Sequence, residues 1–265
     1  MQLSIRHTTT YRYDSPVVYA LQKVRLRPQS AQHQKIEEWS VKIEGGVIEA
    51  DYLDHHGNHV DLVNVDRDAQ VITITASGTV QTLDNHGILG HVYGQAPLWH
   101  FAQPTPATTP NQEILDLIGD LPGAADKIDA LHRLSARVIA AIPYRIGATG
   151  SDTTAAEAMA AGAGVCQDHA QVFVTVARAA GMSARYISGY LMMDDRIDQD
   201  ATHAWAEVHI DGLGWVGFDV SNGISPDERY VRIASGCDAR DAAPTQGLRV
   251  GDAGEHMIVS LQVQQ

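Results

Sequence analysis

The sequence predicts a two-domain α+β protein in which an antiparallel β-sandwich-like domain precedes a domain of mixed helices and strands. Short β-branched and aromatic runs, each bounded by Gly, Asn, Asp or Pro, fill residues 1–95. From residue 111 onward, segments rich in Ala, Leu and Ile at helical spacing come first, and strand-like runs follow. Between the two regions, residues 96–110 contain four prolines, which predicts an extended linker.

The first strand of the N-terminal domain is predicted by alternation in LSIRHTTTYRYD, because a period of two is typical of a strand with one buried face. Later runs such as VIEADYL and HVDLVNV have the same character. The tripeptide His56-Gly57-Asn58 separates these two runs. Since Gly and Asn tolerate positive φ, it predicts a hairpin turn.

The second domain is predicted to span residues 111–265. The segment TTAAEAMAAGAG predicts a short helix capped at Thr153 or Thr154, and CQDHAQVFVTVARAAGM predicts a longer one that ends near Gly181. The runs ARYISGYLMM, THAWAEVHI and WVGFDV predict strands, and the tail is expected to add one or two more. An earlier helix is predicted by apolar residues that share one face: Ile128, Leu131, Leu134, Val138 and Ile139.

Composition argues against several classes of function. The formal net charge of −13 opposes binding to nucleic acid or to anionic lipid, both of which need clustered Lys and Arg. No apolar run approaches the ~20 residues of a membrane span, and MQLSIRHTTTYRYDSPV lacks the apolar centre of a signal peptide. The two cysteines form no CxxC pair, so neither a disulfide framework nor a Cys-rich zinc site is expected. We therefore expect a cytoplasmic location and free thiols.

The stretch GAGVCQDHA places Cys166 between a glycine-rich approach and the start of a predicted helix. A helix N-terminus favours the thiolate, the reactive form of cysteine. Gly162 and Gly164 would allow a substrate backbone to approach closely. The alternative is that Cys166 is a small buried residue, which is the more frequent role of a lone cysteine. This stretch by itself leaves both interpretations open.

A second stretch, THAWAEVHIDGLGWVGFDVSNG, offers groups that would assist a cysteine nucleophile. His203 and Asp219, on neighbouring predicted strands, are candidates for the base and for the carboxylate that orients it. We predict a three-residue DGL loop that pairs Ile210 with Gly214. That register sets His203 opposite Ser221 and leaves Asp219 on the diagonal, within side-chain reach.

The motifs GVCQDHA, SGY and HAWAEVHIDGLGWVGFDVSNG resemble the transglutaminase-like superfamily. The similarity extends to HTTTYRYDSPV, VRLRP and ARDAAPTQG, which resemble a bacterial branch with an N-terminal β domain. The resemblance implies a papain-like α+β core in which Cys166 is the nucleophile, His203 the base and acid, and Asp219 the orienting carboxylate. It implies a cysteine-dependent amide-bond enzyme that forms a thioester acyl-enzyme on a peptide or protein substrate.

The sequence also departs from the animal cross-linking members of that superfamily. They have a tryptophan directly after the nucleophile and bind calcium, whereas Gln167 and Asp168 follow Cys166 here. The acidic loop 194–200 lacks the glycine and terminal glutamate of an EF-hand, so we interpret it as a solvated turn. The resemblance is thus to a protease-like branch, and hydrolysis is favoured. Two alternatives stay open: transfer of glutamine acyl groups to amines, and a non-catalytic peptide-binding module.

Three further residues are candidates for contacts with substrate. Gln167 is a candidate oxyanion donor beside the Cys166 backbone N–H, and the alternative is a polar residue outside the site. Trp205 is expected either to form a wall of the site or to pack within the sheet. Tyr144 is expected either to line the substrate groove or to lie in the core.

No cofactor and no metal site are expected. The histidines of HHGNH, residues 55, 56 and 59, cluster in sequence, but adjacent residues in a strand point to opposite faces. Cys237 is interpreted as a free cysteine without a catalytic role. Neither the oligomeric state nor the purpose of the N-terminal domain follows from the sequence.

Overall fold

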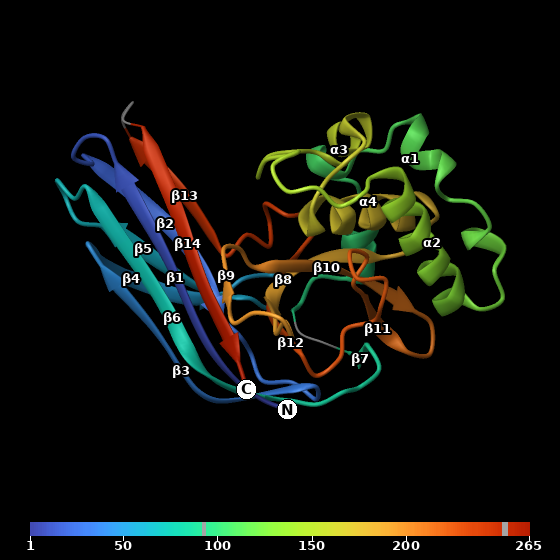
Figure 1. The fold of residues 1–265 in the computed structure, drawn as a ribbon, viewed down its shortest axis with the longest axis horizontal. Coiled ribbons are helices and arrows are strands. Elements are labelled where there is room, and N and C mark those ends of the chain that lie inside the picture. Colours follow the sequence, from blue (N-terminus) through green and yellow to red (C-terminus); the bar gives the residue numbers. More distant parts are fainter. Residues whose placement is uncertain (92–93, 251–253) are drawn as a thin grey trace.

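The computed structural model describes residues 1–91, 94–250 and 254–265. A β-sandwich stands beside a second sheet that carries the helices on one face (Figure 1). The α+β class and the N-terminal β domain predicted from the sequence are therefore confirmed. The strands of the N-terminal region are β1 (Gln2–Tyr13), β2 (Tyr19–Arg27), β3 (Gln34–Glu44), β4 (Gly46–Leu53), β5 (His59–Val65) and β6 (Val71–Thr82).

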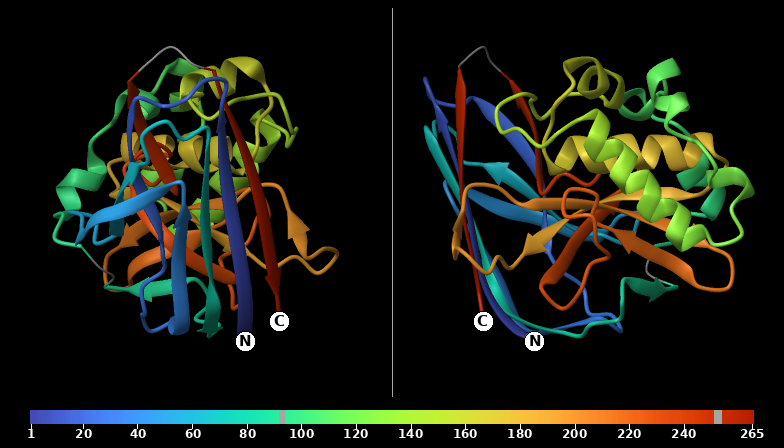
Figure 2. Two further views of the ribbon diagram at one scale, coloured as in Figure 1. Left: turned by 90° about the vertical axis from the view of Figure 1, so that its left-hand side faces the viewer. Right: turned by 45° about the vertical axis from the view of Figure 1, so that its right-hand side comes forward.

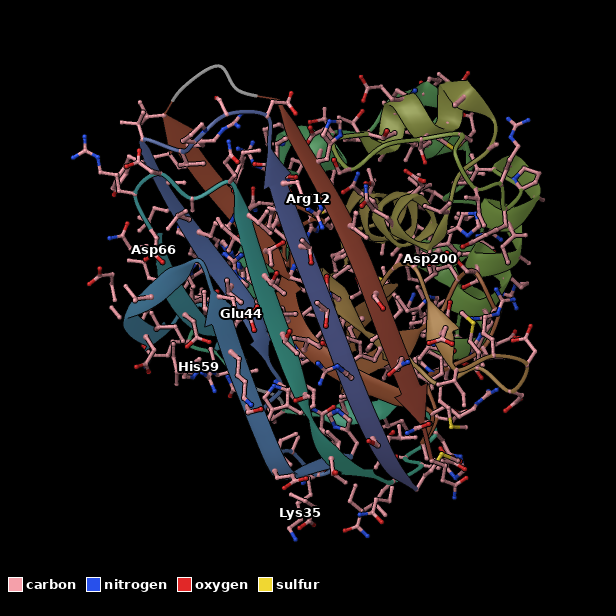
Figure 3. All side chains as sticks on the ribbon, turned by 60° about the vertical axis from the view of Figure 1, so that its left-hand side comes forward. Arg12, Lys35, Glu44, His59, Asp66 and Asp200 are labelled. Carbon is pink, nitrogen blue, oxygen red and sulfur yellow. The ribbon has the colours of Figure 1, made fainter. Side chains whose placement is uncertain are left out.

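The sandwich consists of two antiparallel sheets. One has the order β3-β6-β1-β14-β9 and the other β13-β2-β5-β4. Figure 3 shows the long strands of the first sheet side by side, and Asp200, at the end of the acidic loop, lies beyond β14. The strands that do not belong to the N-terminal region are β9 (Asp198–Gln199), β13 (Thr245–Val250) and β14 (Glu255–Gln264).

The alternation that predicts β1 extends along the whole strand. The buried face that results packs into two different apolar clusters. Its buried side chains near the N-terminal end, Leu3 and Ile5, pack in a cluster with residues of the second domain such as Tyr190. Those near the other end, Tyr11 and Tyr13, pack between the two sheets of the sandwich. One face of one strand therefore joins the two halves of the molecule.

The predicted boundary of the second domain requires a correction at the C-terminal end. Strand β14 pairs with β1 along its length, and β13 pairs with β2, so residues 245–264 complete the N-terminal sandwich instead of extending the domain predicted for 111–265. The two marked chain ends accordingly lie close together in every view (Figures 1 and 2). The acidic loop contributes β9 to the same sheet, with Gln199 buried and residues 194–198 exposed.

The second sheet has the order β12-β8-β10-β11-β7. Its strands are β7 (Ile88–Gly90), β8 (Ala184–Leu191), β10 (His203–Ile210), β11 (Gly214–Phe218) and β12 (Tyr230–Gly236). The helices α1 (Gln112–Asp116), α2 (Lys127–Ala141), α3 (Ala155–Ala161) and α4 (Cys166–Ala179) lie together over one face (Figures 1 and 2). The apolar face predicted for α2 packs into this core, and Thr154 caps α3 as expected.

Residues 96–110 are packed against the second domain, in contrast to the extended linker that their prolines predict. They form the short 3-10 helices η1 (Leu98–Ala102) and η2 (Pro106–Thr108), and a third, η3 (Leu121–Gly123), follows α1. The buried guanidinium of Arg178, on α4, donates to the Phe101 carbonyl (2.8 Å) and to Thr108 Oγ1 (3.0 Å). The segment is thereby fixed to α4. Among the described residues, no helix is both long and apolar enough to cross a membrane.

Candidate active site

Cys166 is the first residue of α4, as the sequence predicts. The residue before it, Val165, is extended and donates its backbone N–H to Asp168 Oδ2 over 2.8 Å. Thr149 Oγ1 donates to the same oxygen over 2.6 Å. The first N–H groups of a helix have no acceptor within the helix and carry partial positive charge. A half-buried Cys166 therefore lies where a negative charge is favoured.

Gly164 is needed for the turn that leads into α4. A Cβ atom at this position would lie 2.7 Å from the Cβ of Asp168, closer than two carbon atoms can pack. Any side chain would therefore displace the carboxylate that fixes the backbone just before Cys166. This requirement comes from the packing of the turn itself and is independent of any substrate.

His203 and Asp219 are brought together by the register that the sequence predicts. Ile210 pairs with Gly214 across the DGL loop, and the register continues unbroken to Ala206 and Phe218. The chain leaves β11 at the next residue, and His203 Nε2 donates to Asp219 Oδ2 over 2.6 Å. Both side chains are buried, at 8% and 0% exposure.

The Asp219 carboxylate has further donors that the sequence analysis missed. Asn222 donates from Nδ2 (2.7 Å) and from its backbone N–H (3.2 Å), and the Tyr230 hydroxyl donates over 2.7 Å. Burial alone would raise the pKa of Asp219, but the hydrogen bonds and the charge of His203 outweigh it and lower that pKa. Asn222 was recognisable from its spacing after Asp219 as an Asx-type turn. Tyr230 gave no local signal, because it comes from β12.

Cys166 lies close enough to His203 for its charge to act on the imidazole. Since Nε2 is engaged by Asp219, Nδ1 is the ring nitrogen that is left for another partner. Burial would lower the pKa of this imidazole, but the hydrogen bonds and charges of Asp219 and Cys166 raise it to about 10. His203 beside Asp219 therefore carries a proton, and with it a positive charge, at neutral pH.

The sulfur lies against a small apolar cluster that contains one hydroxyl group. Cys166 packs with Ala170, Ala204 and Ala242 and with the tyrosine ring of Tyr186 on β8. Burial, reinforced by the negative charge of Cys166, raises the pKa of Tyr186 well above its ordinary value. Its hydroxyl therefore stays protonated and can act as a donor near the sulfur.

The three other predicted site residues lie in different surroundings. Tyr144 is 54% exposed, and burial together with the charge of Cys166 raises its pKa, so it lies near Cys166 and outside the core. Trp205 is buried and its ring stacks on that of His203. Gln167 is not aimed at an oxyanion, because its amide donates to the carbonyls of Gly150 and Ser151 (3.2 and 3.1 Å).

His169, three residues after Cys166, is a polar member of the site region that the sequence analysis did not single out. Its Nδ1 contacts Ser221 Oγ over 2.8 Å, and its Nε2 contacts the Ile142 carbonyl over 2.7 Å. Its ring meets that of Tyr144 edge to face. His169 thus ties the start of α4 to the segment after β11, near Asp219.

Comparison with known proteins assigns the family. Residues 117–220 match the model of the transglutaminase-like superfamily, and residues 3–81 match the bacterial transglutaminase-like N-terminal region. The chain belongs to the transglutaminase-like superfamily. The superfamily match contains Cys166, His203 and Asp219.

Similar proteins extend over the whole chain. An uncharacterized protein of Mycobacterium tuberculosis is 29% identical over 288 residues and covers 98% of this chain and 90% of its own length. One of Mycobacterium leprae is 25% identical over 282 residues, with 99% and 98% covered. A crystal structure from Cytophaga hutchinsonii, named as a candidate cysteine protease, superposes with a TM-score of 0.78. It is 21% identical and covers 100% of this chain and 91% of its own, so it supports the fold.

Proposed function

We propose that this protein is a cysteine-dependent amide-bond enzyme that forms a thioester with a peptide or protein substrate, and that hydrolysis is its main reaction. The observation that carries the proposal is the position of His203. One ring nitrogen donates to Asp219 over 2.6 Å, and the charge of Cys166 acts on the same ring. A histidine between a thiol and a carboxylate is the arrangement that activates a cysteine nucleophile.

In the first half-reaction, the Cys166 thiolate attacks the carbonyl carbon of the substrate amide. The His203 imidazolium then gives its Nδ1 proton to the leaving nitrogen as the C–N bond breaks, and a thioester remains on Cys166. The raised pKa of His203 suits this step, because the proton is still on the ring at neutral pH. Asp219 stabilises the charge and fixes the orientation of the ring.

In the second half-reaction, neutral His203 takes a proton from water as the water oxygen attacks the thioester, and the thiolate leaves. An amine in place of water would give acyl transfer by the same route. Two observations favour water. Cys166 is half-buried beside the exposed Tyr144, so water can reach this part of the molecule, and the Cytophaga relative carries the name of a candidate cysteine protease.

The oxyanion of the tetrahedral intermediate needs donors near the sulfur. The backbone N–H of Cys166 is one, since it belongs to the first turn of α4. We assign the second donor to the Tyr186 hydroxyl, because its ring packs with Cys166 while the Gln167 amide is engaged elsewhere. The cytoplasmic location expected from the cysteine content stays a prediction.

The decisive test is the rate at which iodoacetamide alkylates Cys166 as a function of pH, with Cys237→Ser as the background. Half-maximal reactivity should lie well below the ordinary thiol pKa of about 8.5, and adding His203→Ala should move it upward. The size of the shift measures how strongly the imidazolium stabilises the thiolate.

A titration like that of an ordinary thiol, unchanged by His203→Ala, would contradict the proposal and favour a peptide-binding module. If the pair is present, a peptide-amide library with and without a fluorescent primary amine separates the two reactions. Release of free acid in the presence of the amine supports hydrolysis. Incorporation of the amine as the main product would instead favour acyl transfer.

A further inference from the structure

A second cluster of histidine, cysteine and aspartate lies outside the candidate active site. It gathers three segments that are far apart in sequence. His55 and His56 come from the β4–β5 turn, His100 from η1, and Cys237 and Asp241 from the chain after β12. None of these residues takes part in the chemistry proposed for Cys166.

The potential ligand atoms form two close groups that share His56. Those of His55, His56 and His100 are all within 4.8 Å of one another, as are those of His56, Cys237 and Asp241. Cys237 Sγ is 3.2 Å from His100 Nε2. Two ligands of a tetrahedral zinc ion are separated by about 3.3–3.6 Å, given bonds of about 2.0–2.3 Å. The measured separation of Cys237 and His100 is close to that spacing.

His56 provides an independent indication of a missing partner. Its side chain is fully buried, and its Nδ1 has no hydrogen-bond partner, although a buried polar atom without one is costly. Its other nitrogen, Nε2, donates to Asp241 Oδ2 over 2.6 Å. A histidine that binds a metal through one nitrogen commonly donates from the other to a carboxylate. Asp241 would thus hold the ring while Nδ1 binds an ion.

The three segments are fixed in place by contacts other than the cluster itself. The Asn58 side chain donates to the Ser235 carbonyl and accepts from the Ser235 N–H, each over 2.8 Å, which joins the β4–β5 turn to β12. Arg178 donates to the carbonyls of Cys237 (2.7 Å) and Phe101 (2.8 Å), which joins η1 to the same region. The ligands are therefore held near each other before any ion binds.

We propose that His56, His100 and Cys237 bind a divalent transition-metal ion, with His55 as the fourth ligand on the solvent side. Nitrogen and sulfur ligands favour Zn²⁺ over Mg²⁺ or Ca²⁺, which take oxygen. His55 is exposed, whereas His56 and Cys237 are buried. The ion would therefore lie near the surface, where the β4–β5 turn, η1 and the chain after β12 meet. It would link the N-terminal sandwich, residues 96–110 and the second domain.

This proposal differs from the expectation drawn from the motif HHGNH. The argument against a metal there assumes that neighbouring residues point to opposite faces of a strand. His55 and His56 lie in the turn between β4 and β5, where that alternation does not apply, and their ring centroids are 3.9 Å apart. The other ligands, His100 and Cys237, are remote in sequence and gave no spacing signal.

The test is a titration of the full-length Cys166→Ser variant with Co²⁺, which substitutes for Zn²⁺ and reports its ligands by absorption. The variant removes the other thiol, so a thiolate-to-cobalt charge-transfer band can arise only from Cys237. We expect the band to saturate at one equivalent and to disappear when Zn²⁺ is added. Adding Cys237→Ser should abolish it, and His100→Gln should weaken Co²⁺ binding at least about tenfold.

A matched control and a second readout keep the proposal falsifiable. His86→Gln, at a histidine whose side chain is 87% exposed, should leave the Co²⁺ titration unchanged. Zn²⁺ should raise the melting temperature of Cys166→Ser, and this rise should vanish in the His100→Gln variant. The proposal is overturned if Cys166→Ser gives no charge-transfer band, if the band survives Cys237→Ser, or if Zn²⁺ stabilises the His100→Gln variant equally.

Discussion

The chain contains two clusters of cysteine, histidine and aspartate whose surroundings differ. In both, a histidine Nε2 donates to an aspartate Oδ2 over 2.6 Å. Cys166 is half-buried at the start of a helix, and the histidine it faces is the one bound to the aspartate. Cys237 is 6% exposed, burial raises its pKa to about 11, and the nitrogen beside its sulfur belongs to His100.

The comparison teaches that proximity of the three residue types does not define an active site. In the first cluster a single ring, His203, contacts the carboxylate and is affected by the charge of the cysteine, and we propose that this ring holds and releases the proton. In the second, the aspartate and the cysteine contact different rings, His56 and His100. Several lone pairs then converge on a small volume, which suits a metal ion better than proton transfer.

Replacing the cysteine of each cluster by serine should produce the largest difference in kcat/KM between the two clusters. Cys166→Ser should lower kcat/KM for a peptide amide at least about 10⁴-fold, because the hydroxyl is not ionised beside His203. Cys237→Ser should lower kcat/KM by at most about tenfold and reduce the melting temperature in the presence of Zn²⁺. Equal losses of activity in the two variants would remove the distinction between the clusters.

Exchange of each aspartate for asparagine should separate the clusters by pH dependence. The pKa of His203 is raised to about 10, so the imidazolium needed for amine release persists at neutral pH and is lost as pH rises through 10. Asp219→Asn removes a main cause of that increase. The alkaline limb of kcat/KM should move to lower pH, and kcat should fall about 10³-fold.

Asp241→Asn is the counterpart and should not move the alkaline limb, since Asp241 contacts His56. The measurement is kcat/KM from pH 5 to about 11 for wild type and both variants. A limb that stays near pH 10 in Asp219→Asn would show that another group supplies the proton.

The smallest expected effect concerns the hydroxyl beside Cys166. Tyr186→Phe should lower kcat about tenfold with KM unchanged, because the oxyanion donor acts in the transition state. Tyr190→Phe on the same strand is the matched control, since its hydroxyl contacts His7 on β1. A rise in KM at constant kcat for Tyr186→Phe would assign that tyrosine to substrate binding.

The sequence predicted the features that depend on interactions between residues close together in the chain. The alternation in β1, the Thr154 cap and the start of α4 at Cys166 follow from the side-chain periods of strands and helices. The pairing of Ile210 with Gly214 followed from loop length, and it placed His203 near Asp219. That prediction needed only two adjacent strands and one turn.

Features that depend on remote parts of the chain were missed. The tail was expected to form strands, but nothing in its sequence shows that β13 and β14 pair with β2 and β1. Tyr230 reaches Asp219 from another strand, and the side chain of Gln167 satisfies two loop carbonyls. Such strand pairings and side-chain hydrogen bonds depend on the assembled fold. The residues involved are far apart in the sequence, so they form no periodic pattern that could predict the contact.

The position of β14 has a consequence for how the protein is made. Strand β1 is flanked by β6 on one side and by β14 on the other, yet more than two hundred residues separate it from β14 in the sequence. Until residues 255–264 leave the ribosome, one edge of β1 has unpaired backbone groups that can recruit strands from other chains. During synthesis, this edge therefore stays open to pairing with other chains for as long as β14 has not been made.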